Sequence, residues 1–135
     1  DEAKSTDGDP HIRQHRRSRQ LAISRNRMIA AVSSADVVLL NPTHLTVALK
    51  YEPGKSAPRV VAKGAGAVAA KIRERATENR VPMVTDVPLA RALYAACAVG
   101  QEIPEELYSA VARVLAFVMA LKRRGAALGT HRMAG

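Results

Sequence analysis

The sequence predicts an α/β domain in which a small, mixed, roughly four-stranded sheet is flanked by helices and preceded by a long basic helix. Four short apolar runs have the length and pattern of strands, namely residues 37–40, 45–51, 59–63 and 82–85. Three later segments repeat apolar residues at helical spacing, namely residues 66–80, 88–100 and 104–124. Strands and helices that alternate in this way are typical of a sheet covered by helices. A chain of 135 residues is long enough for one core.

Residues 1–35 are predicted to form a polar linker and a basic helix. Residues 1–9 carry four acids and one lysine, whereas residues 10–35 carry six arginines and no acid. Apolar residues become more frequent toward the end of this segment, so the helix should be solvated at its start and packed near its end. Beside a membrane, its first arginines would favour anionic lipid: Arg13, Arg16, Arg17 and Arg19. A solvated charged helix without lipid contact is the alternative.

The first two predicted strands differ in pattern. Residues 37–40 are continuously apolar, as in a strand buried on both faces, while residues 45–51 alternate apolar with smaller or polar side chains. The Pro, Gly and Ser content of residues 52–58 predicts a loop before the third strand. Gly64-Ala65-Gly66 lacks the Gly-Lys-Ser/Thr ending of a phosphate-binding loop, so we interpret it as a turn into a helix.

The helices have recognisable start and stop signals. Val81-Pro82 ends the predicted helix at residues 66–80, before the fourth strand. Asp86 and Pro88 open the short helix at residues 88–100. Pro104 begins the last helix, acids follow at its start, and basic residues precede Gly125 at its end. We therefore expect one domain over residues 36–124 and a disordered tail over residues 125–135.

Composition limits the classes of function. The single cysteine, Cys97, excludes a disulfide within the chain and is best interpreted as a core residue. No apolar run approaches the roughly 18 residues that span a bilayer, and no signal peptide is visible. The polar start without a methionine indicates a cut through a linker. Neither paired carboxylates, a metal-ligand cluster nor a Ser/Cys–His set is present, so no cofactor, no metal and no multiple-turnover enzyme are expected.

The net charge of +9 raises the alternative of a nucleic-acid-binding module. Three Tyr, one Phe and no Trp offer few platforms for base stacking, and no zinc-ligand set or base-reading motif accompanies the arginines. We expect no specific nucleic-acid binding. A binding assay across a salt series distinguishes the two classes, because contacts to phosphate weaken steeply with added salt.

The candidate functional motif is Asn41-Pro42-Thr43-His44, which lies between the first two predicted strands. Asparagine usually degrades when the next backbone N–H attacks its side chain, but Pro42 has no N–H. The reverse attack remains, in which the Asn41 amide nitrogen adds to its own carbonyl carbon, closes a succinimide and expels the Pro42 nitrogen. We expect His44 to act as an auxiliary proton carrier and the Thr43 hydroxyl to stabilise the oxyanion or orient the amide. An ordinary turn is the alternative interpretation of an Asn-Pro pair.

The segments around this motif resemble the FlhB family, the export-switch proteins of the flagellar type III secretion apparatus and their virulence-injectisome relatives. The resemblance covers most of residues 8–124 and is carried by residues 8–13, 36–51, 60–64, 71–74, 81–82, 88–94 and 100–108. Residues 45–51 look more like flagellar members than injectisome members, which remain the alternative.

The resemblance implies a cytoplasmic domain that follows a membrane domain, at the cytoplasmic face of the bacterial inner membrane. It implies single-turnover self-cleavage between Asn41 and Pro42 and a role in switching export from rod and hook proteins to filament proteins. The implied partners are export substrates, the hook-length regulator and the neighbouring export-gate protein. As a separate hypothesis, we expect that breaking the turn frees Pro42, Thr43 and His44 and exposes a recognition surface.

Overall fold

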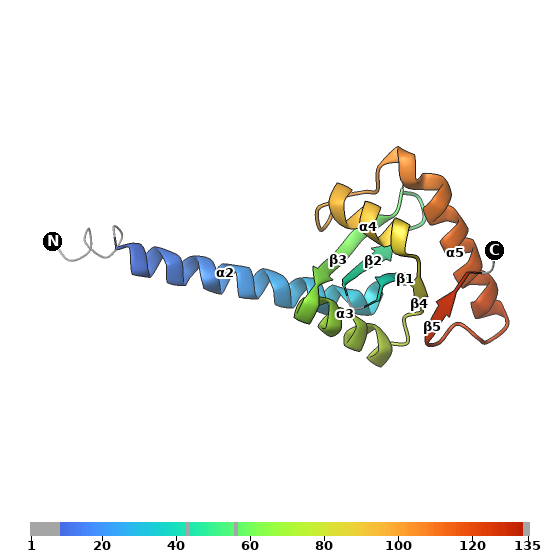
Figure 1. Ribbon diagram of the computed structural model, residues 1–135, viewed down its shortest axis with the longest axis horizontal. Coiled ribbons are helices and arrows are strands. Elements are labelled where there is room, and N and C mark those ends of the chain that lie inside the picture. Colours follow the sequence, from blue (N-terminus) through green and yellow to red (C-terminus); the bar gives the residue numbers. More distant parts are fainter. Residues whose placement is uncertain (1–8, 43, 56, 134–135) are drawn as a thin grey trace.

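The computed structural model describes residues 9–42, 44–55 and 57–133. A long helix, α2 (Pro10–Ala31), projects from a body that contains the strands and the other helices (Figure 1). Asp9 caps α2 by accepting a hydrogen bond from the His11 backbone N–H at 2.9 Å, and Pro10 suits the first helical position. The long basic helix predicted from the sequence is confirmed.

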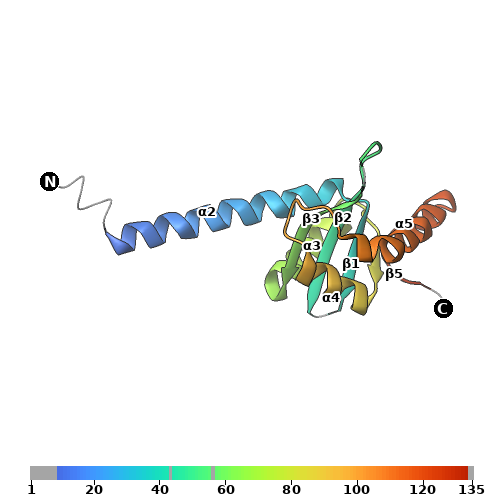
Figure 2. The ribbon, with the colours of Figure 1, turned by 90° about the horizontal axis from the view of Figure 1, so that it is seen from above.

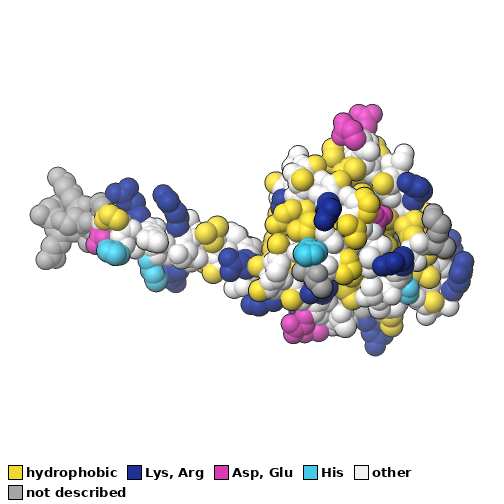
Figure 3. All heavy atoms as spheres, viewed as in Figure 1, with side chains coloured by type: hydrophobic (Ala, Val, Ile, Leu, Met, Phe, Trp, Pro, Cys, Tyr) yellow, Lys and Arg dark blue, Asp and Glu magenta, His cyan; other side chains and the backbone are white. Residues whose placement is uncertain are grey.

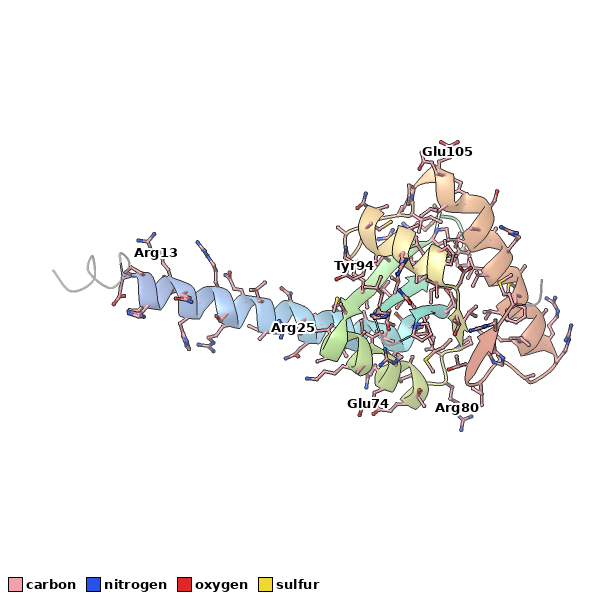
Figure 4. The ribbon with its side chains drawn as sticks, viewed as in Figure 1. Arg13, Arg25, Glu74, Arg80, Tyr94 and Glu105 are labelled. Atoms are coloured by element: carbon pink, nitrogen blue, oxygen red, sulfur yellow. The ribbon has the colours of Figure 1, made fainter. Side chains whose placement is uncertain are left out.

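Contact between α2 and the body is limited to the end of the helix. No residue of α2 is buried, and Leu21 is 63% exposed. Met28 and Ile29 pack against the core just before the 3₁₀ turn η1 (Val32–Ser34), where Val32 is fully buried. Figure 4 shows side chains spread around α2, with Arg13 near its start and Arg25 near the body. This agrees with a helix that is solvated first and packed last.

The sheet has five strands in the order β3-β2-β1-β4-β5. Their bounds are β1 Val37–Asn41, β2 Leu45–Lys50, β3 Arg59–Ala65, β4 Met83–Thr85 and β5 Thr130–Arg132. The pairs β1–β2 and β2–β3 are antiparallel, while β1–β4 and β4–β5 are parallel, so the sheet is mixed as predicted. β1 lies at the centre, between β2 and β4.

β5 adds a fifth strand to the roughly four-stranded sheet that was predicted, and it lies within the segment where a disordered tail was expected. Thr130 pairs with Met83 and Arg132 with Thr85, which extends the sheet beyond the predicted boundary at residue 124. The His131 ring Nε2 lies 3.1 Å from the Ala127 carbonyl oxygen and 2.9 Å from that of Leu128, so it donates to these carbonyls. A segment of only three residues, two of them exposed, is too short to show a strand pattern in the sequence. Backbone pairing with β4 creates this strand.

Side chains on the two faces of the sheet form two cores. Val37 and Leu39 of β1 face helices α4 (Val87–Ala96) and α5 (Tyr108–Arg123), whereas Val38 and Leu40 face α3 (Gly66–Glu78) and η1 (Figure 2). This alternation explains the continuous apolar run, because β1 is covered on both faces. The Asp86 carboxylate caps α4 by accepting from the Leu89 N–H at 3.1 Å. A 3₁₀ turn, η2 (Glu105–Leu107), precedes α5.

Candidate functional site

The candidate motif forms the tight connection between the two central antiparallel strands. β1 ends at Asn41, β2 begins at Leu45, and these two residues pair across the ladder. The Asn41 residue is only 5% exposed, whereas Pro42 and His44 are exposed. Thr43 lies outside the described residues, so the role predicted for its hydroxyl stays a prediction. The Asn41–Pro42 bond therefore joins a buried residue to an exposed one.

Asn41 lies on the same face of β1 as Val37 and Leu39, because successive strand residues alternate between faces. That face is covered by the core beneath α4 and α5. At 5% exposure, Asn41 is largely withdrawn from bulk water. Burial would thus limit competition from solvent during an attack within this residue.

The carbonyl that would be attacked already accepts a hydrogen bond. The His44 backbone N–H donates to the Asn41 carbonyl oxygen at 3.0 Å. When a nucleophile adds to this carbon, negative charge develops on the same oxygen, and a donor at hydrogen-bond distance stabilises that charge. In such a reaction the donor to this oxygen would be the backbone N–H of His44 rather than its imidazole.

Two further backbone hydrogen bonds hold the flanks of the motif. The Asp86 N–H donates to the Leu40 carbonyl oxygen at 3.1 Å, and the Gly66 N–H donates to the His44 carbonyl oxygen at 3.3 Å. Sequence reasoning interpreted Asp86 as a helix cap and Gly66 as a turn residue, and it missed both contacts with the motif. Strand order and register bring these residues to the turn, and no local pattern encodes them.

The opposite face below the turn is closely packed. Thr46 is fully buried, and its hydroxyl oxygen lies 3.4 Å from the Arg73 Nη1 of α3. A Cβ added at Gly64 would clash with the Val68 side chain, so α3 packs directly on β3 at this point. The start of β2 is thereby fixed against the helix that follows β3.

Other chemistry is scarce in the described part of the chain. Burial raises the pKa of the Cys97 thiol, partly offset by the Lys63 charge, and the residue is 1% exposed, so the prediction of a core cysteine is confirmed. No group of three His, Cys, Asp or Glu side chains there could hold a metal ion. Nor is any helix among these residues long and apolar enough to cross a membrane.

An apolar groove of about 650 Å³ lies away from the turn, between α5 and the segment before β3. Its apolar lining includes Ala57, Pro58, Ile103, Val111 and Leu115. Tyr51 and Asp36 lie at the groove, and the Asp36 carboxylate accepts a hydrogen bond from the Tyr51 backbone N–H at 2.6 Å.

Basic side chains are spread along α2 and over the visible face of the body (Figure 3). They do not gather into a single patch on that face.

Fold and site together define a class of protein, an α/β domain with an Asn-Pro turn between its two central antiparallel strands. Residues 1–118 match the model of the FlhB HrpN YscU SpaS family. The chain belongs to this family.

Similar proteins include the flagellar biosynthetic protein FlhB of Escherichia coli K12, which is 56% identical over 124 residues. FlhB of Bacillus subtilis 168 is 44% identical over 125 residues. These alignments cover 91% and 92% of this chain but 32% and 35% of the relatives, so the chain spans about a third of the curated relatives it matches.

Solved structures agree with this assignment. The cytoplasmic domain of FlhB from Shewanella putrefaciens superposes with a TM-score of 0.72 at 42% identity, covering 82% of this chain and 92% of that one. The PscU C-terminal domain superposes with a TM-score of 0.54 at 37% identity, covering 57% of this chain and 99% of that one. The α/β fold predicted from the sequence is thus confirmed.

Proposed function

We propose that this chain is the cytoplasmic domain of a flagellar type III export component and that it cuts its own backbone between Asn41 and Pro42. The observation that carries the cleavage proposal is a 5% exposed asparagine before proline, whose carbonyl oxygen accepts the His44 N–H at 3.0 Å. Family membership and the names of the FlhB relatives support the export assignment. Similarity to the cytoplasmic domain of the Shewanella FlhB supports the cytoplasmic face of the inner membrane as the location.

The proposed reaction rearranges bonds without a cofactor. The Asn41 Nδ2 forms a bond to the Asn41 carbonyl carbon, and the bond from that carbon to the Pro42 nitrogen breaks. One proton leaves Nδ2 and one proton is gained by the Pro42 nitrogen, which becomes the new amino terminus. The first fragment then ends in a succinimide, and water later opens this ring. The reaction turns over once because the attacking residue is consumed.

Cleavage would prepare the domain for its role in export. The proposed partners are export substrates, the hook-length regulator and export-gate proteins, and cutting would help to switch export from rod and hook proteins to filament proteins. The exposed positions of Pro42 and His44 support a recognition surface that changes when the turn is opened. The apolar groove beside α5 suits an apolar segment of such a partner.

We also propose that the chain belongs to the flagellar branch of the family and that α2 contacts the membrane. The 56% identity to a flagellar FlhB, against 37% to PscU and 31% to a mutated EscU C-terminal domain, favours the flagellar branch over an injectisome component. The projecting basic helix α2 supports contact with anionic lipid through Arg13, Arg16, Arg17 and Arg19. No nucleic-acid partner is proposed.

Intact mass measurement under denaturing conditions tests the cleavage proposal. We expect two fragments, Asp1–Asn41 and Pro42–Gly135, that copurify under native conditions and separate after unfolding. After the succinimide opens, their masses together should exceed the mass of the uncut chain by one water molecule. A single mass equal to the full chain, persisting after long incubation at neutral pH, contradicts the proposal.

Replacing His44 by alanine should slow cleavage without abolishing it. The variant keeps the backbone N–H that faces the Asn41 carbonyl and loses only the imidazole that moves protons. The parent chain should therefore cut faster than the variant. Rates measured at neutral pH check this, with His11→Ala on the exposed face of α2 as the control. Equal rates for the parent and His44→Ala would leave turn geometry as the main cause of the rate.

A further inference from the structure

We infer that Gly66, at the junction of β3 and α3, is a positioning residue for self-cleavage that holds His44 in the orientation facing the susceptible bond. The inference rests on the proposed function and extends it to a residue outside the motif. Gly66 lies 25 positions after Asn41 in the sequence. Sheet register brings it to the turn, since Ala65 pairs with Leu45 at the start of β2.

The contact is part of a short relay of backbone hydrogen bonds. The Gly66 N–H donates to the His44 carbonyl oxygen at 3.3 Å, and the His44 N–H donates to the Asn41 carbonyl oxygen at 3.0 Å. These two groups lie on either side of the His44 Cα, so together they restrict both backbone dihedral angles of His44. That restriction aims the N–H at the carbonyl under attack and fixes the direction in which the imidazole leaves the turn.

The start of α3 shows why the carbonyl of His44 is needed there. The first N–H groups of a helix lack partners within the helix, and they are usually satisfied by a capping side chain. Ala65 occupies the cap position of α3 and forms no side-chain cap. The His44 carbonyl oxygen thus accepts from one of these N–H groups. The turn in return needs the Gly66 N–H, because this donor restrains the His44 carbonyl group.

The backbone conformation of Gly66 makes glycine important at this position. Its φ is +56°, in the left-handed region where a side chain is unfavourable. A Cβ at Gly66 would meet no atom within 4 Å, so a substitution would act through the backbone and not through a clash. If the chain relaxes toward negative φ, the direction of the Gly66 N–H changes and His44 loses its partner.

Gly54 is a matched control for this inference. It has a φ of +86°, a Cβ there would also meet no atom within 4 Å, and it lies in the loop between β2 and β3. Gly66→Ala and Gly54→Ala therefore introduce the same kind of backbone strain at two places. We expect Gly66→Ala to slow cleavage roughly tenfold, and Gly54→Ala to leave the rate within about twofold of the parent.

A conservative variant separates positioning from a general loss of stability. Asparagine tolerates the left-handed region better than alanine does, so the rate should fall in the order Gly66, Gly66→Asn, Gly66→Ala. Thermal unfolding of each substitution in an uncut Asn41→Ala background measures stability apart from cleavage. The inference is overturned if Gly66→Ala and Gly54→Ala slow cleavage equally, or if Gly66→Asn is as slow as Gly66→Ala at equal stability.

A second measurement does not depend on cleavage. In the uncut Asn41→Ala background, hydrogen exchange of the His44 N–H reports the bond to the residue 41 carbonyl. Gly66→Ala should speed this exchange at least roughly fivefold, and Gly54→Ala should not change it. Unchanged exchange in Gly66→Ala contradicts the inference even if the chain does not cut itself. Failure of the parent to cleave, with faster exchange in Gly66→Ala, would instead contradict the proposed function and retain only the positioning of His44 by Gly66.

Discussion

Asn41→Ala should abolish cleavage and leave a folded, uncut chain. The substitution removes the amide nitrogen that attacks and keeps the backbone bonds from His44 to residue 41 and from Asp86 to Leu40. The neighbours of Asn41 in β1 are fully or almost fully buried, so the strand should hold its place without this side chain. Denaturing mass spectrometry after long incubation should show one species with the full mass.

The matched control is Asn26→Ala, because Asn26 is exposed on α2 and is followed by arginine instead of proline. This variant should cut at the rate of the parent. Thermal unfolding should show that both variants remain cooperatively folded. Normal cleavage of Asn41→Ala would require a nucleophile other than the Asn41 side chain and would refute the proposed chemistry.

Leu39→Ala should strongly weaken the association of the first cleavage fragment, residues 1–41, with the second. Leu39 is fully buried in β1, and truncating such a leucine costs about 2–5 kcal/mol of stability. In an uncut Asn41→Ala chain, that loss should appear as a lower free energy of unfolding in denaturant titration. In a cut chain, the same loss acts on the association of the two fragments, because β1 belongs to the first fragment and pairs with strands of the second.

Size-exclusion chromatography at decreasing concentrations measures this association. The cut parent should elute as one complex, whereas the cut Leu39→Ala chain should separate into two fragments at concentrations where the parent remains associated. Leu21→Ala is the control, since Leu21 lies on the same fragment and is 63% exposed. Equal association of the Leu39→Ala and Leu21→Ala chains would show that β1 packing does not hold the fragments together.

The sequence predicted the features that depend on local patterns. Continuous apolar residues at 37–40 indicated a strand covered on both faces, and Asp86 with Pro88 indicated the start of α4, both of which the structure confirms. β5 and the contacts of Gly66 and Asp86 with the motif were missed. These features arise from pairing between distant segments, so no local sequence pattern at Thr130–Arg132 or at Gly66 signals them.

The central position of β1 also determines how the domain would carry mechanical load. A pull on α2 reaches the body where the end of the helix and Val32 pack against the core, and in the intact chain it continues along covalent bonds through β1 and the turn into β2. After a cut at Asn41, the load can leave β1 only through non-covalent contacts, which are its hydrogen bonds with β2 and β4 and its packing against the helices on both faces of the sheet. A covalent joint that resists tension thus becomes a non-covalent joint whose lifetime under tension is set by the rate at which β1 is pulled out.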